Sequence, residues 1–405
     1  MDLSYGSEYG VFRQQVRDFI EANRDQAPAA GARGPAGLAW QKLLIDNGYH
    51  SRTVPKAYGG YGAAPDILAS RIIAEEFSAA QLSTGLGGQG ISMLTPMLLE
   101  MGSEAQKLQF IQPTILGEMV WCQGYSEPGA GSDLASLTTK AELDGDEWVI
   151  NGQKIWTSTA QSADWIFCLV RTDFEVPKHS GISFILFDMR SKGVTTKPIK
   201  LISGNSVFCE TFFDDVRVPA RNVVGKLNDG WAIAKRLLQH ERTMISGFGL
   251  GGGRAARGSQ NTGLDAVAMT YRGDKGRLSD PVLRDQIAQH RIDSEAFAFT
   301  SQRSAQEAKQ SRGPNATSSM LKNYGCELNK RRYELLLRAM GTQALGWESV
   351  NPEDFGPQEL AAARDWLRSK GNSIEGGTYE VQLNVIAKRV LGLPDMTSML
   401  AKQEN

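Results

Sequence analysis

The 405-residue chain is poor in the residue types that mark metal centres and disulfide scaffolds, with only four cysteines and four histidines. The cysteines lie far apart and form no CxxC pair, which indicates neither a zinc site nor a disulfide framework. The chain also lacks an apolar run long enough to span a membrane, and its N-terminal segment has no signal-peptide core. We therefore expect free thiols, no bound metal, no membrane insertion and a cytoplasmic location.

A strong charge of either sign is missing too, because 44 Lys and Arg residues face 45 Asp and Glu residues, for a net charge of −1. Such a balance gives no general attraction to nucleic acid or to an anionic membrane. The apolar fraction of 41% is typical of a globular protein, and the length exceeds one typical hydrophobic core. We expect two or three packed units and no nucleic-acid partner.

Hydrophobic patterning divides the chain into three parts. Residues 1–117 have helical periodicity, residues 118–225 contain short apolar or alternating runs separated by turns, and helical periodicity returns over 226–405. The pattern predicts an α+β protein in which a β domain lies between two helical domains with these boundaries. In the last domain, helices are expected over 281–311, 317–341, 357–370 and 379–391.

The most informative segment runs from Gln123 to Ser158. Its loop contains Gly129 and Gly131, which let a backbone approach a ligand closely because no side chain intervenes. Asn151-Gly152 is a strong short hairpin signal, and we expect the hairpin to aim Trp156 back toward the loop. A flat aromatic ring beside hydroxyl groups suits a planar cofactor with polar edges, such as an isoalloxazine ring.

Two motifs in this segment resemble those of the acyl-CoA dehydrogenase family. SEPGAGSD, beginning at Ser126, matches the family's flavin-loop motif (T/S)EPxAGSD, and NGQKIWTS, beginning at Asn151, matches NGxKxW(I/T)(T/S). The resemblance covers nearly the whole chain. It implies an N-terminal helical domain, a middle β-barrel or sandwich domain, and a C-terminal four-helix bundle.

The resemblance also implies a bound FAD and an acyl-CoA substrate. The residues expected to contact FAD are Gln123, Tyr125, Ser126, Ser132, Trp156, Thr157, Ser158, Gln343, Gly377 and Thr378. Ser132 would also reach the substrate, and Arg242 would contact its CoA portion.

The catalytic base is expected away from its usual position in the family. Aligning the chain on Gly377-Thr378 puts Gly376 where the family's usual Glu stands, and Glu375 lies one residue too early. A one-residue offset turns a side chain by about 100° on a helix, so Glu375 is not predicted to act. The isovaleryl and long-chain members also lack this Glu and carry their base in a Glu-Arg pair after a Gly-Trp. Glu241-Arg242, after Gly230-Trp231, matches that position.

The implied reaction converts the thioester to a trans-2-enoyl-CoA. Glu241 would take the α-proton while flavin N5 accepts the β-hydride, and the Gly376 N–H would help to bind the thioester oxygen. Electrons would pass to an electron-transfer flavoprotein. The reactive carboxylate gains basicity when bound substrate excludes water from it.

One family motif, which holds the adenine half of FAD, is missing. The region 271–291 has Arg272 and Arg277 as candidate substitutes, and Trp347 replaces the second glycine of a Gln-x-x-Gly-Gly contact. Its LSDPVLR segment resembles a bacterial branch that acts on bulky, cyclic or dicarboxylic acyl-CoAs and includes heteromeric assemblies. We expect a homodimer or homotetramer, with a heterotetramer as the alternative. The competing functions are a non-catalytic partner subunit and a flavin oxidase or monooxygenase of the same fold.

Overall fold

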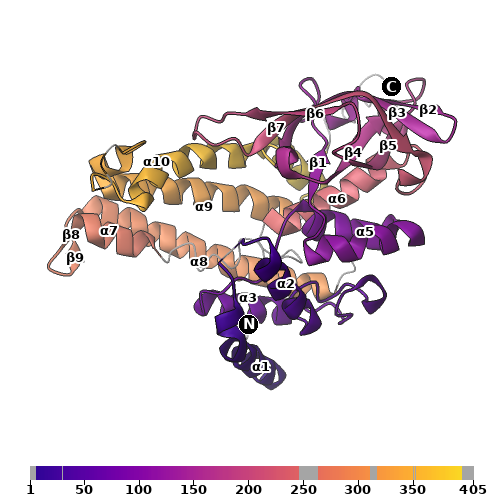
Figure 1. Ribbon diagram of the computed structural model, residues 1–405. Coiled ribbons are helices and arrows are strands. Elements are labelled where there is room, and N and C mark those ends of the chain that lie inside the picture. Colours follow the sequence, from indigo (N-terminus) through magenta and orange to yellow (C-terminus); the bar gives the residue numbers. More distant parts are fainter. Residues whose placement is uncertain are drawn as a thin grey trace. The chain divides into compact units, whose positions relative to one another are not determined.

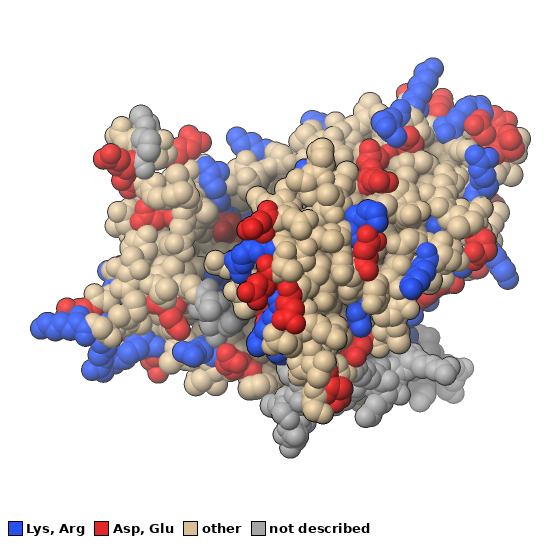
Figure 2. Space-filling view, turned by 60° about the horizontal axis from the view of Figure 1, so that its bottom comes forward, with Lys and Arg blue, Asp and Glu red and all other residues tan. Residues whose placement is uncertain are grey.

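The computed structural model describes residues 6–29, 31–245, 263–310, 317–349, 351 and 353–394, without the side chains of 239–245, 305–310 and 317. The chain divides into two compact units (Figure 1). One comprises residues 1–200 and 206–256, and the other comprises 201–205 and 257–405. Acidic and basic side chains are interspersed on the face shown in Figure 2, as the balanced composition leads one to expect.

The first unit begins with a group of helices. They are α1 (Ser7–Asn23), α2 (Pro35–Asp46), α3 (Ile67–Ala79), α4 (Thr95–Met101) and α5 (Glu104–Leu116), with a π-helical turn (Gly90–Leu94) directly before α4. Asp66 starts α3 by accepting hydrogen bonds from the N–H groups of Leu68 and Ala69, and Ser103 starts α5 with a capping box. Val16 and Ile20 of α1 are buried among side chains of α2 and α3, which confirms the helical pattern.

A buried histidine ties this helical region together. His50 is 3% exposed, and its Nε2 lies 2.8 Å from the carbonyl oxygen of Leu86, an acceptor that requires Nε2 to carry a proton. Nδ1 then accepts from Gln41 Nε2 at 3.0 Å or Ser51 Oγ at 2.9 Å. Burial lowers the pKa of His50 to about 4, although the bond to the Leu86 carbonyl opposes that shift. The neutral imidazole is therefore part of the folded structure.

We expect this histidine to make the fold sensitive to mild acid. The unfolded chain binds a proton near pH 6.5 and the folded chain only near pH 4, so stability is complete above pH 6.5 and is lost as pH falls toward 4. The urea midpoint should therefore drop less between pH 7 and pH 5 in His50→Gln than in the wild type. His179→Gln, at an exposed position, is the matched control. Equal drops in His50→Gln and the wild type would contradict the prediction.

The middle of the chain forms a seven-stranded sheet with the order β1-β4-β2-β3-β7-β6, in which β5 also pairs with β4. Its strands are β1 (Trp121–Gly124), β2 (Lys140–Asp144), β3 (Glu147–Ser158), β4 (Trp165–Arg171), β5 (Ile182–Asp188), β6 (Val194–Ile199) and β7 (Phe208–Pro219). Strands β4 and β5 bury almost every side chain, which explains why their sequences are largely apolar instead of alternating.

The predicted hairpin at Asn151-Gly152 is wrong. Both residues lie inside the continuous strand β3, and the turn between β2 and β3 falls at Gly145, whose φ is 65°. Asn151 instead accepts a hydrogen bond from the Asp215 N–H of β7 at 2.9 Å, beside a register shift in the β3–β7 ladder. A Cβ on Gly152 would lie 2.7 Å from the Cα of Thr139, so this glycine permits a close backbone approach.

Helix α6 (Gly230–Ile245) completes the first unit. It packs on the π-helical turn and on β5, and Ile233, Ala234 and Leu237 form its buried face. These three positions follow helical spacing, so one stripe of the helix faces the hydrophobic core.

The second unit is helical, as predicted. It contains α7 (Leu264–Arg272), α8 (Pro281–Gln310), α9 (Thr317–Met340), α10 (Pro357–Ser369), α11 (Tyr379–Val385) and a small hairpin of β8 (Gly273–Asp274) and β9 (Arg277–Leu278). Helices α7, α8, α10 and α11 all pack on α9. None of the helices in the described part of the chain combines the length and the apolar content that a bilayer span requires.

Candidate functional site

The predicted flavin loop and strand β3 lie together. The N–H of Ile155 donates to the carbonyl oxygen of Ser126 at 2.8 Å. Ile155 lies where the β3–β7 register shifts, between Lys154 and Thr157, so β3 contains a bulge at this contact. Trp156 lies in the bulge with a φ of 61°, a left-handed conformation that is uncommon for a bulky residue. The bulge is therefore a built feature that re-aims side chains at the end of the strand.

The bulge turns Trp156 outward and Thr157 inward. The Trp156 side chain is 52% exposed, and its ring meets the edge of Phe208 at a centroid distance of 6.0 Å. Thr157 is fully buried, and its hydroxyl has no hydrogen-bond partner among the described residues. A buried hydroxyl without a partner is costly, so this position fits a polar group supplied by a ligand. Ser158 ends the strand and is partly buried.

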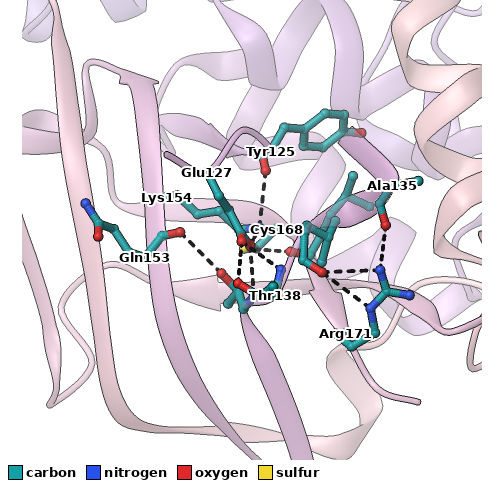
Figure 3. A network of polar contacts seen from close by, with 11 residues as sticks. Tyr125, Glu127, Ala135, Thr138, Gln153, Lys154, Cys168 and Arg171 are labelled. Atoms are coloured by element: carbon teal, nitrogen blue, oxygen red, sulfur yellow. Dashed lines mark hydrogen bonds and ion pairs between the residues drawn. The ribbon is translucent and has the colours of Figure 1, made fainter. Parts of the chain in front are cut away.

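A buried ion pair holds the start of the loop to β3 (Figure 3). The Lys154 ammonium, fully enclosed, lies 2.8 Å from Glu127 Oε1 and donates to the Tyr125 carbonyl oxygen at 3.2 Å. Glu127 also accepts from the N–H groups of Thr138 and Thr139, at 2.7 and 2.9 Å. Burial alone would raise the pKa of Glu127, but the Lys154 charge and these donors outweigh it and lower the pKa to about 2.

A second buried cation holds the other end of the loop. Arg171, at the end of β4, donates to the backbone carbonyl oxygens of Ala135, Leu137 and Lys178. The middle of the loop, from Gly129 to Asp133, is exposed apart from Ala130. Ser132 lies in this exposed stretch, whereas the loop's two ends are fixed (Figure 3).

Gln123 and Tyr125, also predicted at the start of the loop, both contact other residues of the protein. Gln123 Oε1 accepts from Gln89 Nε2 at 3.2 Å, and the buried Oε1 of Gln89 has no partner among the described residues. The Tyr125 ring lies edge-on to Phe167 and Phe184 in the core. The Tyr125 backbone therefore accepts the hydrogen bond from Lys154, and its ring packs in the core.

In the second unit, the predicted Gly376-Gly377-Thr378 segment forms a turn before α11. Both glycines have positive φ, 67° and 91°, which favours glycine over any other residue. Gln382 Nε2 donates to the Gly376 carbonyl oxygen at 2.9 Å, and Lys322 Nζ donates to that of Gly377 at 2.7 Å. Thr378 caps α11 by accepting from the N–H of Val381. The Gly376 N–H donates to no group in the described part of the chain.

The other predicted residues are less informative. Gln343 is exposed on the short helix Gly341–Leu345. Glu241 and Arg242 lie on helix α6, but their side chains fall outside the described residues. Of the two candidate substitutes for the adenine contact, Arg272 donates to the Ala339 carbonyl oxygen at 3.0 Å, next to the helix that carries Gln343, and Arg277 lies in β9.

Comparison with known proteins gives the same family over all three parts. The models for the N-terminal, middle and C-terminal domains of acyl-CoA dehydrogenases match residues 7–118, 122–216 and 228–391. The acyl-CoA dehydrogenase IpdE1 of Mycolicibacterium smegmatis is 32% identical over 96% of this chain and 98% of its own length. The chain belongs to the acyl-CoA dehydrogenase family.

Solved structures show the same fold. One described as "Tcur3481-Tcur3483 steroid ACAD" has a TM-score of 0.78 and 30% identity, and covers 97% of this chain and 100% of that chain. The ChsE4-ChsE5 complex from Mycobacterium tuberculosis has a TM-score of 0.75 and 27% identity, over 98% of this chain and 100% of that chain. The acyl-CoA dehydrogenase fold, with its helical N-terminal domain, middle β-sheet domain and helical C-terminal domain, is therefore confirmed.

This acyl-CoA dehydrogenase is a FAD-dependent enzyme of an oligomeric family, and its loop fits the cofactor. A Cβ on Gly129 or Gly131 would meet no described protein atom, and neither glycine has positive φ. The protein's own packing therefore does not require glycine at these positions, whereas close approach of a ligand would. The unpartnered Thr157 hydroxyl and the exposed Trp156 ring point to the same ligand.

Sequence reasoning assigned no role to three residues of this region. Glu127 and Lys154 stand at fixed positions of the two motifs, so a signal was present, but the motifs do not say that the two side chains pair. Gln89 lies outside both motifs, and nothing in its local sequence indicates its contact with Gln123.

Proposed function

We propose that this acyl-CoA dehydrogenase converts its acyl-CoA to a trans-2-enoyl-CoA with Glu241 as the base. The observation that carries the proposal is the bulge of β3, which presents Trp156 and the unpartnered hydroxyl of Thr157 next to an open glycine loop. Trp156, Thr157, Ser158 and the loop backbone from Gln123 to Ser132 would hold the flavin. When bound, FAD supplies the two-electron acceptor for the β-hydrogen.

The backbone of α6 supports Glu241 as the base. Position 241 follows Leu237 by four residues, so helical spacing puts it on the stripe formed by Ile233, Ala234 and Leu237. That stripe packs on the π-helical turn next to Gln89, the residue that bonds Gln123 of the flavin loop. A carboxylate at this position loses hydration when substrate binds, which raises its basicity.

The surroundings of Glu375 argue against it as an alternative base. Its Oε2 accepts from Arg368 Nη2 at 2.7 Å, and its Oε1 accepts from Asn372 Nδ2. Both oxygens of the Glu375 carboxylate are therefore engaged by side chains of the protein. Glu375 instead stabilises the turn that precedes Gly376.

The turn at Gly376 suits the binding of a developing oxyanion. Its N–H has no acceptor among the described residues, and the bonds from Gln382 and Lys322 fix the peptide units that follow it. A donor that is fixed before reaction costs no reorganisation when charge develops on the thioester oxygen. We propose that this N–H donates to that oxygen.

The acyl group is proposed to be bulky and ring-containing. The LSDPVLR segment resembles the bacterial branch of the family that acts on bulky, cyclic or dicarboxylic acyl-CoAs. Among these, a ring-containing group is favoured because one similar structure is described as a steroid ACAD. The electrons are proposed to pass to an electron-transfer flavoprotein. Oligomers of one chain and of two different chains both fit the family, which includes the ChsE4-ChsE5 complex.

Anaerobic titration of the purified yellow protein tests this function. We expect ring-containing acyl-CoAs to bleach the flavin absorbance and to yield a product lighter by two hydrogens, with linear acyl-CoAs reacting more slowly. Oxygen uptake during turnover in air should be small compared with the rate in the presence of an electron-transfer flavoprotein. Fast oxygen uptake would favour an oxidase instead.

The partner-subunit alternative rests on the loss of the adenine-side motif and on Trp347. Its ring stacks on the Arg364 guanidinium at 3.9 Å, and Arg364 also donates to the Ser203 carbonyl oxygen at 3.1 Å. Trp347 therefore has a packing role where the family has a cofactor contact. A protein that stays colourless after incubation with FAD, but forms a yellow complex with a second chain, would establish this alternative.

A further inference from the structure

Two buried cations fix the ends of the flavin loop, and neither belongs to the contacts proposed for FAD or substrate. Lys154 is fully buried and joins Tyr125 and Glu127, while Arg171 is 5% exposed and holds Ala135 and Leu137 (Figure 3). Between these anchor points the loop is mostly exposed. The two anchors therefore help to set the position of its backbone N–H groups, together with the buried Ala130 and the ion pair between Asp133 and Lys178.

Lys154 differs from Arg171 in its position, because it lies at the edge of the β3 bulge. It is the last residue of β3 before the register with β7 shifts: Lys154 pairs with Thr211, and the next pair is Thr157 with Cys209. The ammonium thus fixes the strand at the point where one extra residue is inserted. A slip of one residue would turn Trp156 inward and Thr157 outward, because side chains alternate along a strand.

Stability alone does not explain why Lys154 and Glu127 form a buried ion pair. Replacing a buried pair by well-packed uncharged residues of similar volume is often neutral or stabilising in proteins. The Lys154 ammonium donates to Tyr125 and Glu127 in the loop, and its backbone is part of β3 next to the bulge. It couples the loop's backbone position to the conformation of the strand end.

We propose that Lys154 is a positioning residue of the flavin site, which joins Tyr125 and Glu127 to β3 and thereby fixes the bulge that presents Trp156 and Thr157. This inference rests on the proposed placement of FAD. Lys154 does not touch the reacting atoms. It acts through the loop and the bulge. Its loss should therefore affect FAD affinity and the flavin spectrum more than KM for acyl-CoA.

The test uses the double variant Lys154→Met/Glu127→Gln, which removes both charges with little change in volume. Loss of the charged hydrogen bond to the Tyr125 carbonyl should weaken FAD binding by about tenfold. The visible spectrum of the bound flavin should shift, and kcat should fall while KM for acyl-CoA changes little. Lys154→Gln, which keeps an N–H donor, should lie between the wild type and the double variant and serves if the latter does not fold.

Arg217→Met is the matched control, because Arg217 lies on β7 of the same sheet and pairs with Asp144 and Glu147 at the surface. It should leave FAD affinity, spectrum and kcat unchanged. A folded double variant with wild-type values of all three would overturn the proposal. Trp156→Leu and Thr157→Val test the FAD placement separately: if they leave affinity and spectrum unaltered, the placement itself is wrong.

Discussion

Replacing Glu241 by Gln is expected to slow flavin reduction by acyl-CoA by about 10³-fold, because a positioned general base contributes about 10²–10⁴-fold. The amide keeps the size and a polar surface of the side chain but cannot take the α-proton. FAD should stay bound, since Glu241 is not among the residues proposed to hold it. Stopped-flow measurement of flavin bleaching under anaerobic conditions isolates this step from electron transfer and product release.

Three further variants make the assignment specific. Glu241→Asp keeps a carboxylate one methylene shorter and should retain more activity than Glu241→Gln, because its base is displaced but present. Glu375→Gln should retain fast reduction, since that carboxylate is held by Arg368. Glu100→Gln removes the surface partner of Arg236 on α6 and controls for disturbance of the helix. Fast bleaching in Glu241→Gln together with slow bleaching in Glu375→Gln would transfer the role to Glu375.

The helices were predictable because their signals are local. Helical periodicity over 1–117 predicted the helical start of the chain, and the helices predicted over 317–341 and 357–370 appear as α9 and α10 within one residue. The hairpin prediction failed because Asn-Gly describes a local preference, whereas Asn151 is held in the strand by Asp215 of β7. A contact across the sheet outweighed the turn propensity.

The candidate site was only partly predictable, for the same reason. The family resemblance assigned Trp156 and Thr157 to the flavin, but the β3 bulge that turns one outward and the other inward depends on the register with β7. The pairing of Glu127 with Lys154 spans two separate motifs and requires the loop to fold back onto β3. Such contacts are set by tertiary structure, which local patterns do not specify.

Lys154→Met alone is expected to reduce the stability of the first unit by about 3–5 kcal/mol, the usual cost of leaving one member of a buried ion pair without its partner. Glu127, 7% exposed, would keep its bonds to Thr138 and Thr139 but lose the ammonium. The double variant with Glu127→Gln should recover most of the loss. Urea unfolding of the three proteins, followed by tryptophan fluorescence, measures the difference.

The pH dependence of these variants distinguishes lost charge pairing from lost packing. In the wild type the pKa of Glu127 is lowered from 4.5 to about 2, so the pair's contribution is complete above pH 4.5 and is lost as pH falls toward 2. In Lys154→Met, Glu127 loses the ammonium, the strongest of the groups that lower its pKa, so its pKa is higher than in the wild type and protonation relieves the unpaired charge at a higher pH. The gap between wild type and Lys154→Met should therefore narrow as pH falls from 7 to 4. A gap that stays constant over this range would mean that the methylenes of Lys154, and not its charge, stabilise the strand.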